Sequence, residues 1–100
     1  MSGRIVITGA GIISAIGVGK KETLRSLVAR KSGVGRLRHL QTSHSDLPCG
    51  EVNMSDEELK NAIGVPADRI VPRTTLLGII AVREAMEEAG VKGSDRAALI

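Results

Sequence analysis

The segment from Thr75 to Ala89 places the strongest constraint on how this chain can fold, because its first half is apolar on every side. The pattern predicts a helix that ends at Gly90, and the stretch from Leu76 to Val82 leaves it no polar face. Only after Arg83 does the segment become amphipathic, with glutamates opposite alanine and methionine. A helix that is apolar all round is expected to be buried all round. A chain of 100 residues offers little material to cover it, so we expect this helix to lie between further layers of protein.

A short run of β-branched residues, Ile5-Val6-Ile7, stands near the amino terminus. Such a run predicts a strand that is buried on both faces, as in the parallel sheets of α/β proteins. Gly9, Gly11 and Gly17 follow, and glycine permits a positive φ or a close approach of another backbone. Residues Arg4 to Gly17 therefore predict a core strand and a glycine-rich turn, and the fold class α/β.

Two further helices are predicted between these ends of the chain. The first, Lys20 to Arg30, has an apolar face at helical spacing, made of Leu24, Leu27 and Val28. The second, Ser55 to Ile63, begins with the capping box that Ser55 and Glu58 form, and its apolar face consists of Leu59, Ala62 and Ile63. Gly64 follows at the position of a helix-ending glycine. Residues 36 to 50 show no period and predict a loop.

Composition narrows the class of protein. The aromatic fraction is 0%, so the core must be aliphatic, and no aromatic ring is interleaved with the basic residues for base stacking. We therefore expect no nucleic-acid partner despite the net charge of +3. No apolar run approaches the about 20 residues of a membrane span, which predicts no membrane partner. A single cysteine, Cys49, excludes an intrachain disulfide and indicates a reducing, cytoplasmic compartment.

The last residues, Ala97 to Ile100, begin another apolar run. A strand cut off after four residues is a poor natural terminus. We therefore expect residues 1–100 to be the N-terminal part of a single domain in a longer gene product, with no second domain in this chain.

One motif resembles a nucleotide-binding loop. Gly9-Ala10-Gly11-Ile12-Ile13-Ser14 follows a predicted strand, as the dinucleotide fingerprint G-x-G-x-x-G does. Ser14 replaces the third glycine, Gly17 and Gly19 would break the helix that should begin there, and the acidic residue expected at the end of a second strand is missing. A glycine turn required for tight packing is the preferred interpretation, and nucleotide binding is kept as an alternative.

Other chemistry-bearing residues gather in the predicted loop. His39, His44, Asp46 and Cys49 are metal-ligand types, but their spacing matches no common zinc pattern. Cys49 lies in a Pro-Cys-Gly step without an evident base, so a nucleophilic role is not expected. Lys31-Ser32-Gly33 lacks the leading glycine of a phosphate loop and is assigned to the end of a helix. No catalytic, cofactor-binding or metal-binding residue is predicted in this chain.

In their order, these pieces resemble the amino terminus of the β-ketoacyl-ACP synthases, the condensing enzymes of fatty acid and polyketide synthesis. The residues that carry the resemblance run along nearly the whole chain: Arg4 to Gly17, Glu22-Thr23, Leu27, Ala29, Lys31-Ser32-Gly33-Val34, Arg73, Arg83-Glu84-Ala85-Met86 and Glu88-Ala89-Gly90. The chain departs from the family pattern at three places. Ala15 stands in place of proline, Leu24 in place of an aromatic residue, and Pro72-Arg73-Thr74 in place of an Asp-Arg-Phe-like sequence.

The resemblance implies a thiolase-like fold, layered αβαβα in the full protein, with the central helices between two sheets. It implies a homodimer that uses acyl- and malonyl-loaded acyl carrier protein, without a cofactor, in a decarboxylative Claisen condensation. The family's catalytic cysteine and two histidines fall beyond residue 100, so the role implied for these residues is structural. A non-catalytic partner subunit of the chain-length-factor type is the alternative that the resemblance leaves open.

Overall fold

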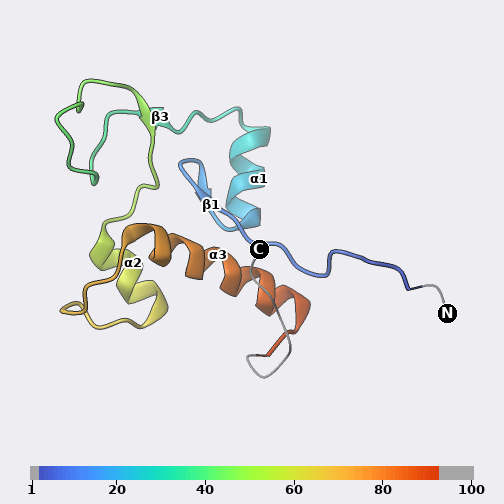
Figure 1. Ribbon diagram of the computed structural model, residues 1–100. Coiled ribbons are helices and arrows are strands. Elements are labelled where there is room, and N and C mark those ends of the chain that lie inside the picture. Colours follow the sequence, from blue (N-terminus) through green and yellow to red (C-terminus); the bar gives the residue numbers. More distant parts are fainter. Residues whose placement is uncertain (1–2, 93–100) are drawn as a thin grey trace.

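The computed structural model of the chain describes residues 3–92. It contains three helices, α1 (Lys20–Val28), α2 (Asp56–Ile63) and α3 (Arg73–Ala89). Four strands of two residues each form two antiparallel pairs (Figure 1). In one pair β1 (Ile13–Ser14) faces β2 (Gly17–Val18), and in the other β3 (Val34–Gly35) faces β4 (Cys49–Gly50). The described chain is therefore of mixed helix and strand.

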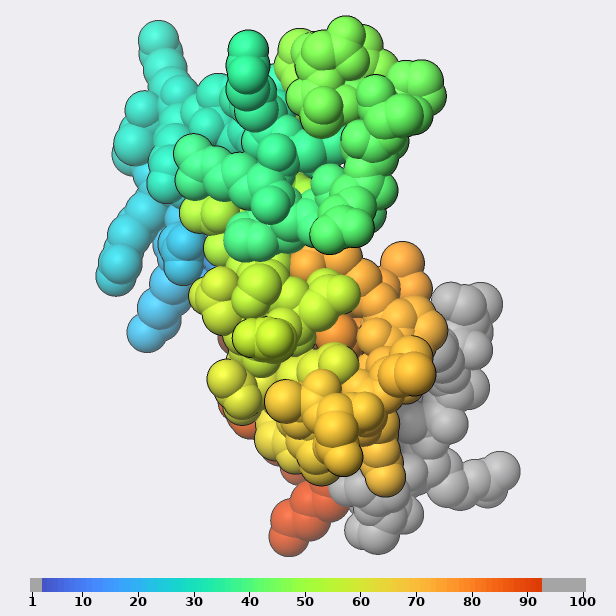
Figure 2. All heavy atoms as spheres, turned by 90° about the vertical axis from the view of Figure 1, so that its left-hand side faces the viewer, coloured from blue at the N-terminus to red at the C-terminus, as the bar shows by residue number. Residues whose placement is uncertain are grey.

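The core lies between α2 and α3. Leu59 and Leu76 are fully buried, and Ile63 retains an exposed fraction of only 7%. Half-buried apolar side chains surround them: Ile13, Met54, Val65, Val71, Leu77, Ile79 and Ile80. In Figure 1 the shorter α2 lies beside the first half of α3, which is the apolar half, and Figure 2 shows the two packed against each other from the side. As the composition predicts, this core is entirely aliphatic.

The local signals of α2 and α3 are confirmed. The Ser55 hydroxyl accepts a hydrogen bond from the Glu58 amide, and the Glu58 carboxylate accepts one from the Ser55 amide, so the capping box is complete. Gly64 and Gly90 end the two helices with φ of 77° and 70°, a left-handed conformation that glycine adopts without steric cost. Helix α3 begins at Arg73, two residues before the predicted start.

The described residues do not bury α3 on every side, as expected for a chain of this length. Its cover by further layers of protein stays a prediction. Leu76 is its only buried residue, and Val82 is 45% exposed. Helix α2 covers one side of α3, and the β1–β2 pair lies near another (Figure 1). A helix apolar all round needs cover on several sides, and residues 3–92 supply it on part of the surface.

The predicted core strand at Ile5-Val6-Ile7 is also contradicted. Ile5 is fully exposed and Ile7 is 90% exposed, and neither residue belongs to a strand. Figure 1 shows the segment running away from the helices. A strand requires backbone partners and cover on its faces, and the described residues provide neither. The predicted strand from Ala97 to Ile100 lies outside the described residues.

Helix α1 forms as predicted but presents a different face to the rest of the chain. Its apolar residues Leu24, Leu27 and Val28 are between 61% and 77% exposed, while Thr23 and Ser26 are buried. The Thr23 hydroxyl donates to the Gly19 carbonyl at 2.8 Å, and the Ser26 hydroxyl donates to the Ile16 carbonyl at 2.5 Å. Both bonds satisfy buried hydroxyls, and the bond from Ser26 also holds α1 on the turn of the β1–β2 pair.

Candidate functional site

The glycine-rich segment lies directly on α3. A Cβ at Gly9 would overlap the Ala85 carbonyl oxygen, and a Cβ at Gly11 would overlap the Ala81 carbonyl oxygen. Ala81 and Ala85 are one turn apart, so two small residues on α3 face two glycines. The prediction that these glycines serve tight packing is therefore confirmed. Because α3 occupies the space beside them, a pyrophosphate has no access to this face of the segment.

Two glutamates of α3 hold the same segment by hydrogen bonds. The Ala10 amide donates to Glu88 Oε1 at 3.1 Å, and the Ile12 amide donates to Glu84 Oε1 at 3.0 Å. The second oxygen of Glu84 accepts from the Lys20 amide at 2.9 Å, and the Lys20 ammonium forms an ion pair with Glu88. One carboxylate thus joins the glycine-rich segment, the amino end of α1 and α3.

The pKa of Glu84 is lowered from its ordinary value of 4.5, mainly by the hydrogen bond from the Lys20 amide and next by that from the Ile12 amide. Lys20 is the first residue of α1, so the negative charge also lies at the positive end of that helix. In the sequence Glu84 and Glu88 fall on the polar face of α3, and this role was not predicted. Their i, i+4 spacing was the available signal, but nothing local showed what they would bind.

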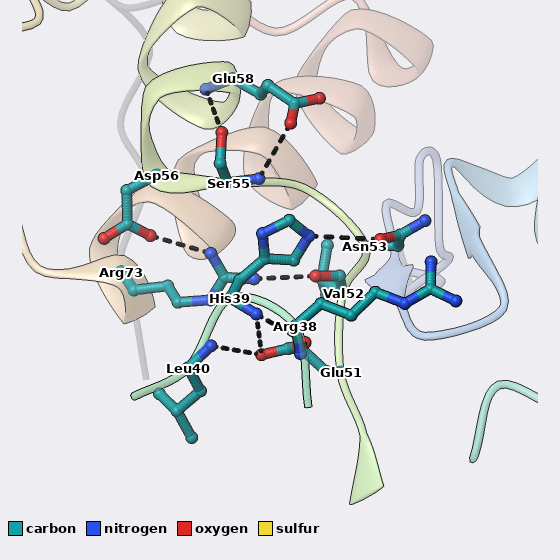
Figure 3. A network of polar contacts seen from close by, with 10 residues as sticks. All are labelled: Arg38, His39, Leu40, Glu51, Val52, Asn53, Ser55, Asp56, Glu58 and Arg73. Atoms are coloured by element: carbon teal, nitrogen blue, oxygen red, sulfur yellow. Dashed lines mark hydrogen bonds and ion pairs between the residues drawn. The ribbon is translucent and has the colours of Figure 1, made fainter. Parts of the chain in front are cut away.

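A second polar network organises the loop between β3 and β4. The Glu51 carboxylate accepts hydrogen bonds from three successive amides, those of Arg38, His39 and Leu40, the shortest at 2.7 Å (Figure 3). These bonds, first among them the one from Arg38, lower the pKa of Glu51. The ionised carboxylate therefore fixes the start of the loop against the segment that follows β4.

Arg73 links this network to the helices. Its guanidinium donates to Asp56 Oδ1 and to the Val52 carbonyl, each at 2.8 Å (Figure 3). Asp56 is the first residue of α2 and Arg73 the first of α3, so the bonds bring the starts of both helices together. Arg73 was singled out in the sequence as part of the family resemblance, and the structure gives it this positioning contact.

The candidate metal and nucleophile residues do not converge. The His39 Nε2 atom pairs with Asn53 Oδ1 at 3.2 Å, whereas His44 and Asp46 are exposed. Cys49 is half-buried in β4. Within residues 3–92, no three His, Cys, Asp or Glu side chains gather in a way that could hold a metal ion.

An open cavity of about 460 Å³ lies between the β1–β2 turn, the residues after α1, and the β3–β4 pair. Its lining includes Lys31, Ser32 and Gly33, which the sequence analysis assigned to the end of a helix. Helix α1 ends at Val28, and the Lys31 amide donates to the Ser26 carbonyl at this end, so the motif follows the helix directly and lies on the wall of the cavity. A smaller hollow of about 340 Å³ lies beside it and is lined partly by Leu37, Leu40 and Leu77.

Across the described part of the chain, no helix is long and apolar enough to cross a lipid bilayer. The described contacts join segments to one another and bring together no nucleophile with a neighbouring base. Residues 3–92 thus join a glycine-rich segment, a loop and three helices to one another.

Comparison with known proteins gives this arrangement a family. Residues 2–98 match the family described as Beta-ketoacyl synthase, N-terminal domain. The chain is also similar to 3-oxoacyl-[acyl-carrier-protein] synthase 1 of Haemophilus influenzae, with 32% identity over 102 residues, which cover 97% of this chain and 24% of that relative. The chain thus spans about a quarter of the length of the curated relative it matches. No solved structure matches it. Since the family match extends over nearly every residue, the chain belongs to the β-ketoacyl synthase family, within the N-terminal domain.

Proposed function

We propose that the chain is the N-terminal segment of a 3-oxoacyl-[acyl-carrier-protein] synthase and that its own role is to act as a scaffold. The observation that carries the proposal is the family match over residues 2–98, because it includes both partners of the glycine-to-helix contact. In that contact the backbone at Gly9 and Gly11 lies against α3, and Glu84 and Glu88 fix it there. Such a unit can hold later catalytic loops in place.

The reaction proposed for the whole protein is a decarboxylative condensation. An acyl group passes from its thioester to a cysteine thiolate, which releases the donor thiol, and the malonyl thioester loses carbon dioxide to leave a carbanion. The carbanion attacks the acyl carbon, the new carbon–carbon bond forms, and the thiolate is released. In this proposal the nucleophile and its two assisting histidines lie outside residues 1–100, and Cys49 takes no part.

Further features of the whole protein belong to the same proposal. The layered thiolase-like fold would cover the faces that residues 3–92 leave exposed, among them Ile5 and Ile7. The protein would be a cytoplasmic homodimer, would act on acyl carrier protein and would need no cofactor. Participation of acyl carrier protein is supported by the name of the Haemophilus influenzae relative.

The decisive experiment is an assay of the longer protein that carries these residues. Carbon dioxide released from malonyl-loaded carrier protein, together with the 3-oxoacyl product, is measured in the presence of an acyl thioester donor. The proposal predicts both products in equal amounts. A protein that releases neither, yet stimulates an active synthase on mixing, would be a non-catalytic partner subunit. A protein that does neither would refute the proposal.

Nucleotide binding at Gly9 and Gly11 is not proposed, because α3 fills the space beside both glycines. Titration of the chain with NAD or NADP should give no saturable response that depends on these two residues. Saturable binding lost on substitution of Gly9 would restore that alternative.

A further inference from the structure

The cavity of about 460 Å³ has the size of a small-molecule site, for which about 300–1,000 Å³ is typical. It is lined mostly by polar and charged groups and by backbone, unlike the common ligand pocket with apolar walls. Its wall residues come from three segments of the chain: 14–22, 31–38, and 49–54. The scaffold role described above makes no use of this cavity.

Close contacts give the cavity defined walls. A Cβ at Gly33 would lie 2.6 Å from the Ala15 Cβ, so the turn of the β1–β2 pair and the segment after α1 touch here. A Cβ at Gly50 would lie 3.5 Å from the same Ala15 methyl group, at ordinary contact distance. Ala15 therefore lies between two glycines of different segments, and this packing sets the distance between the walls.

The charges on the lining are mainly positive. Lys31, Arg36 and Arg38 are exposed cations on the walls, and none of the three side chains has an acidic partner among residues 3–92. Glu22 and Glu51 are the lining carboxylates. Glu51 is already bound by three backbone amides, and Figure 3 shows the Arg38 guanidinium directed away from it. The cavity thus has an excess of cationic donors.

Two hydroxyls on the lining add further hydrogen-bond donors. The Ser14 hydroxyl accepts a hydrogen bond from the Ile16 amide, and the Ser32 hydroxyl accepts one from the Val34 amide at 3.2 Å. Each keeps its own O–H donor, and neither donates to an acceptor in the described part of the chain. Cations and free hydroxyl donors together are suited to a ligand with many acceptor oxygens and negative charge.

From these walls, charges and donors we propose that the cavity binds a small molecule carrying clustered phosphate groups. Arg36 and Arg38 would bind phosphate oxygens through their planar guanidinium groups, which match phosphate geometry in pairs of hydrogen bonds. Lys31 adds a point charge, and Ser32 adds a hydroxyl donor. Lys31-Ser32-Gly33 does not have the spacing of a phosphate loop. It contributes to the proposed phosphate site because it lies on the wall of the cavity. This site is independent of the condensation reaction.

The test is calorimetric titration of the chain with inorganic pyrophosphate at low ionic strength, with sodium sulfate as the comparison anion. We expect saturable binding of one pyrophosphate and weaker binding of sulfate. The double substitution Arg36→Gln and Arg38→Gln should weaken pyrophosphate binding by at least about tenfold, because it removes two charged donors. Amide shifts in NMR spectra should be concentrated at Ser32 and Gly33.

The matched control is the double substitution Lys21→Gln and Arg25→Gln, which removes the same charge from exposed positions of α1 outside the cavity. It should change the affinity by less than about twofold, since only screened long-range attraction is lost. Circular dichroism confirms that both variants keep their helices. Equal losses in the two variants, or the absence of saturable binding, would overturn the proposal.

Discussion

The α2–α3 pair and the glycine-rich amino-terminal segment are held in opposite ways. Leu59, Ile63 and Leu76 join the two helices by burying their side chains between them. The segment from Gly9 to Ile12 is instead held by its backbone. Gly9 and Gly11 have no side chain, so the backbone lies directly against α3, and carboxylates of α3 accept hydrogen bonds from its amides. The apolar residues of the amino-terminal segment remain exposed, so the contacts that fix this segment on α3 are ones that bury no apolar side chain.

The largest expected effect tests the side-chain half of this comparison. Leu76 is fully buried between α2 and α3. Replacing it with alanine removes the buried isopropyl group and leaves a cavity, which should lower the free energy of unfolding by about 2–5 kcal/mol. Urea unfolding followed by circular dichroism measures the change.

Ile70→Ala is the control for that substitution, because Ile70 is 96% exposed and lies in the loop before α3. Its effect should stay within about 0.5 kcal/mol. Equal effects at the two positions would mean that the helix pair is not held by the aliphatic core.

The backbone half of the comparison is tested by Gly11→Ala. The added Cβ would meet the Ala81 carbonyl, so the amino-terminal segment must move away from α3. Overpacking of this kind should lower the free energy of unfolding by about 1–3 kcal/mol. Hydrogen exchange at the Ala10 and Ile12 amides should accelerate, because their bonds to Glu88 and Glu84 would be broken.

A glycine of α3 provides the matched control. Gly78 has no atom within 4 Å of a built Cβ, and it lies inside the helix. Gly78→Ala should therefore stabilise the chain by about 0.5–1 kcal/mol, since alanine favours the helix. If Gly11→Ala also stabilised it, the close approach of the segment to α3 would be refuted.

How far the sequence predicts each region follows from the range of the contacts. Helix α2 was predicted to within one residue because Ser55, Glu58 and Gly64 act within their own helix. The strand at Ile5-Val6-Ile7 was predicted wrongly because a strand depends on distant partners, and the described residues do not include them. The buried side of α1 was not predicted. Burial of Thr23 and Ser26 is favourable only because the carbonyls of Gly19 and Ile16 accept hydrogen bonds from their hydroxyls.

The candidate site divides in the same manner. The packing role of Gly9 and Gly11 could be predicted from what the motif lacks, although their partner helix could not. The binding of Glu51 to three amides, 11 to 13 residues away, has no local signal at all. Sequence patterns of period 2 or 3.6 report single elements, whereas these bonds join separate segments.

A smaller effect tests the local signal of α2. Ser55→Ala removes the hydroxyl that accepts from the Glu58 amide at 3.1 Å. Loss of an N-cap typically costs about 1 kcal/mol in the free energy of unfolding. Ser43→Ala in the exposed loop is the control and should cause no measurable change. An effect at Ser43 as large as that at Ser55 would contradict the assigned cap.

The most local effect concerns Glu84, whose carboxylate binds the amides of Ile12 and Lys20. Its pKa is lowered in the folded chain, so the folded state binds the proton less tightly than the unfolded state does. The stabilisation is therefore complete above the ordinary value of 4.5 and is lost as the pH falls through the lowered pKa. Hydrogen exchange at the two amides, corrected for its intrinsic pH dependence, should show their protection declining below that value.

Glu84→Gln should abolish most of this pH dependence at both amides, because the neutral amide side chain does not titrate and presents one acceptor oxygen where the carboxylate has two. Glu87→Gln, on the exposed side of the same turn of α3, should leave it intact. The Lys20 ammonium and the Glu88 carboxylate are the other charged groups at this contact, and Glu88 binds the Ala10 amide. If substitution of Glu88, but not of Glu84, removed the pH dependence of protection at Ile12 and Lys20, the role assigned to Glu84 would belong to Glu88, one turn further along the helix.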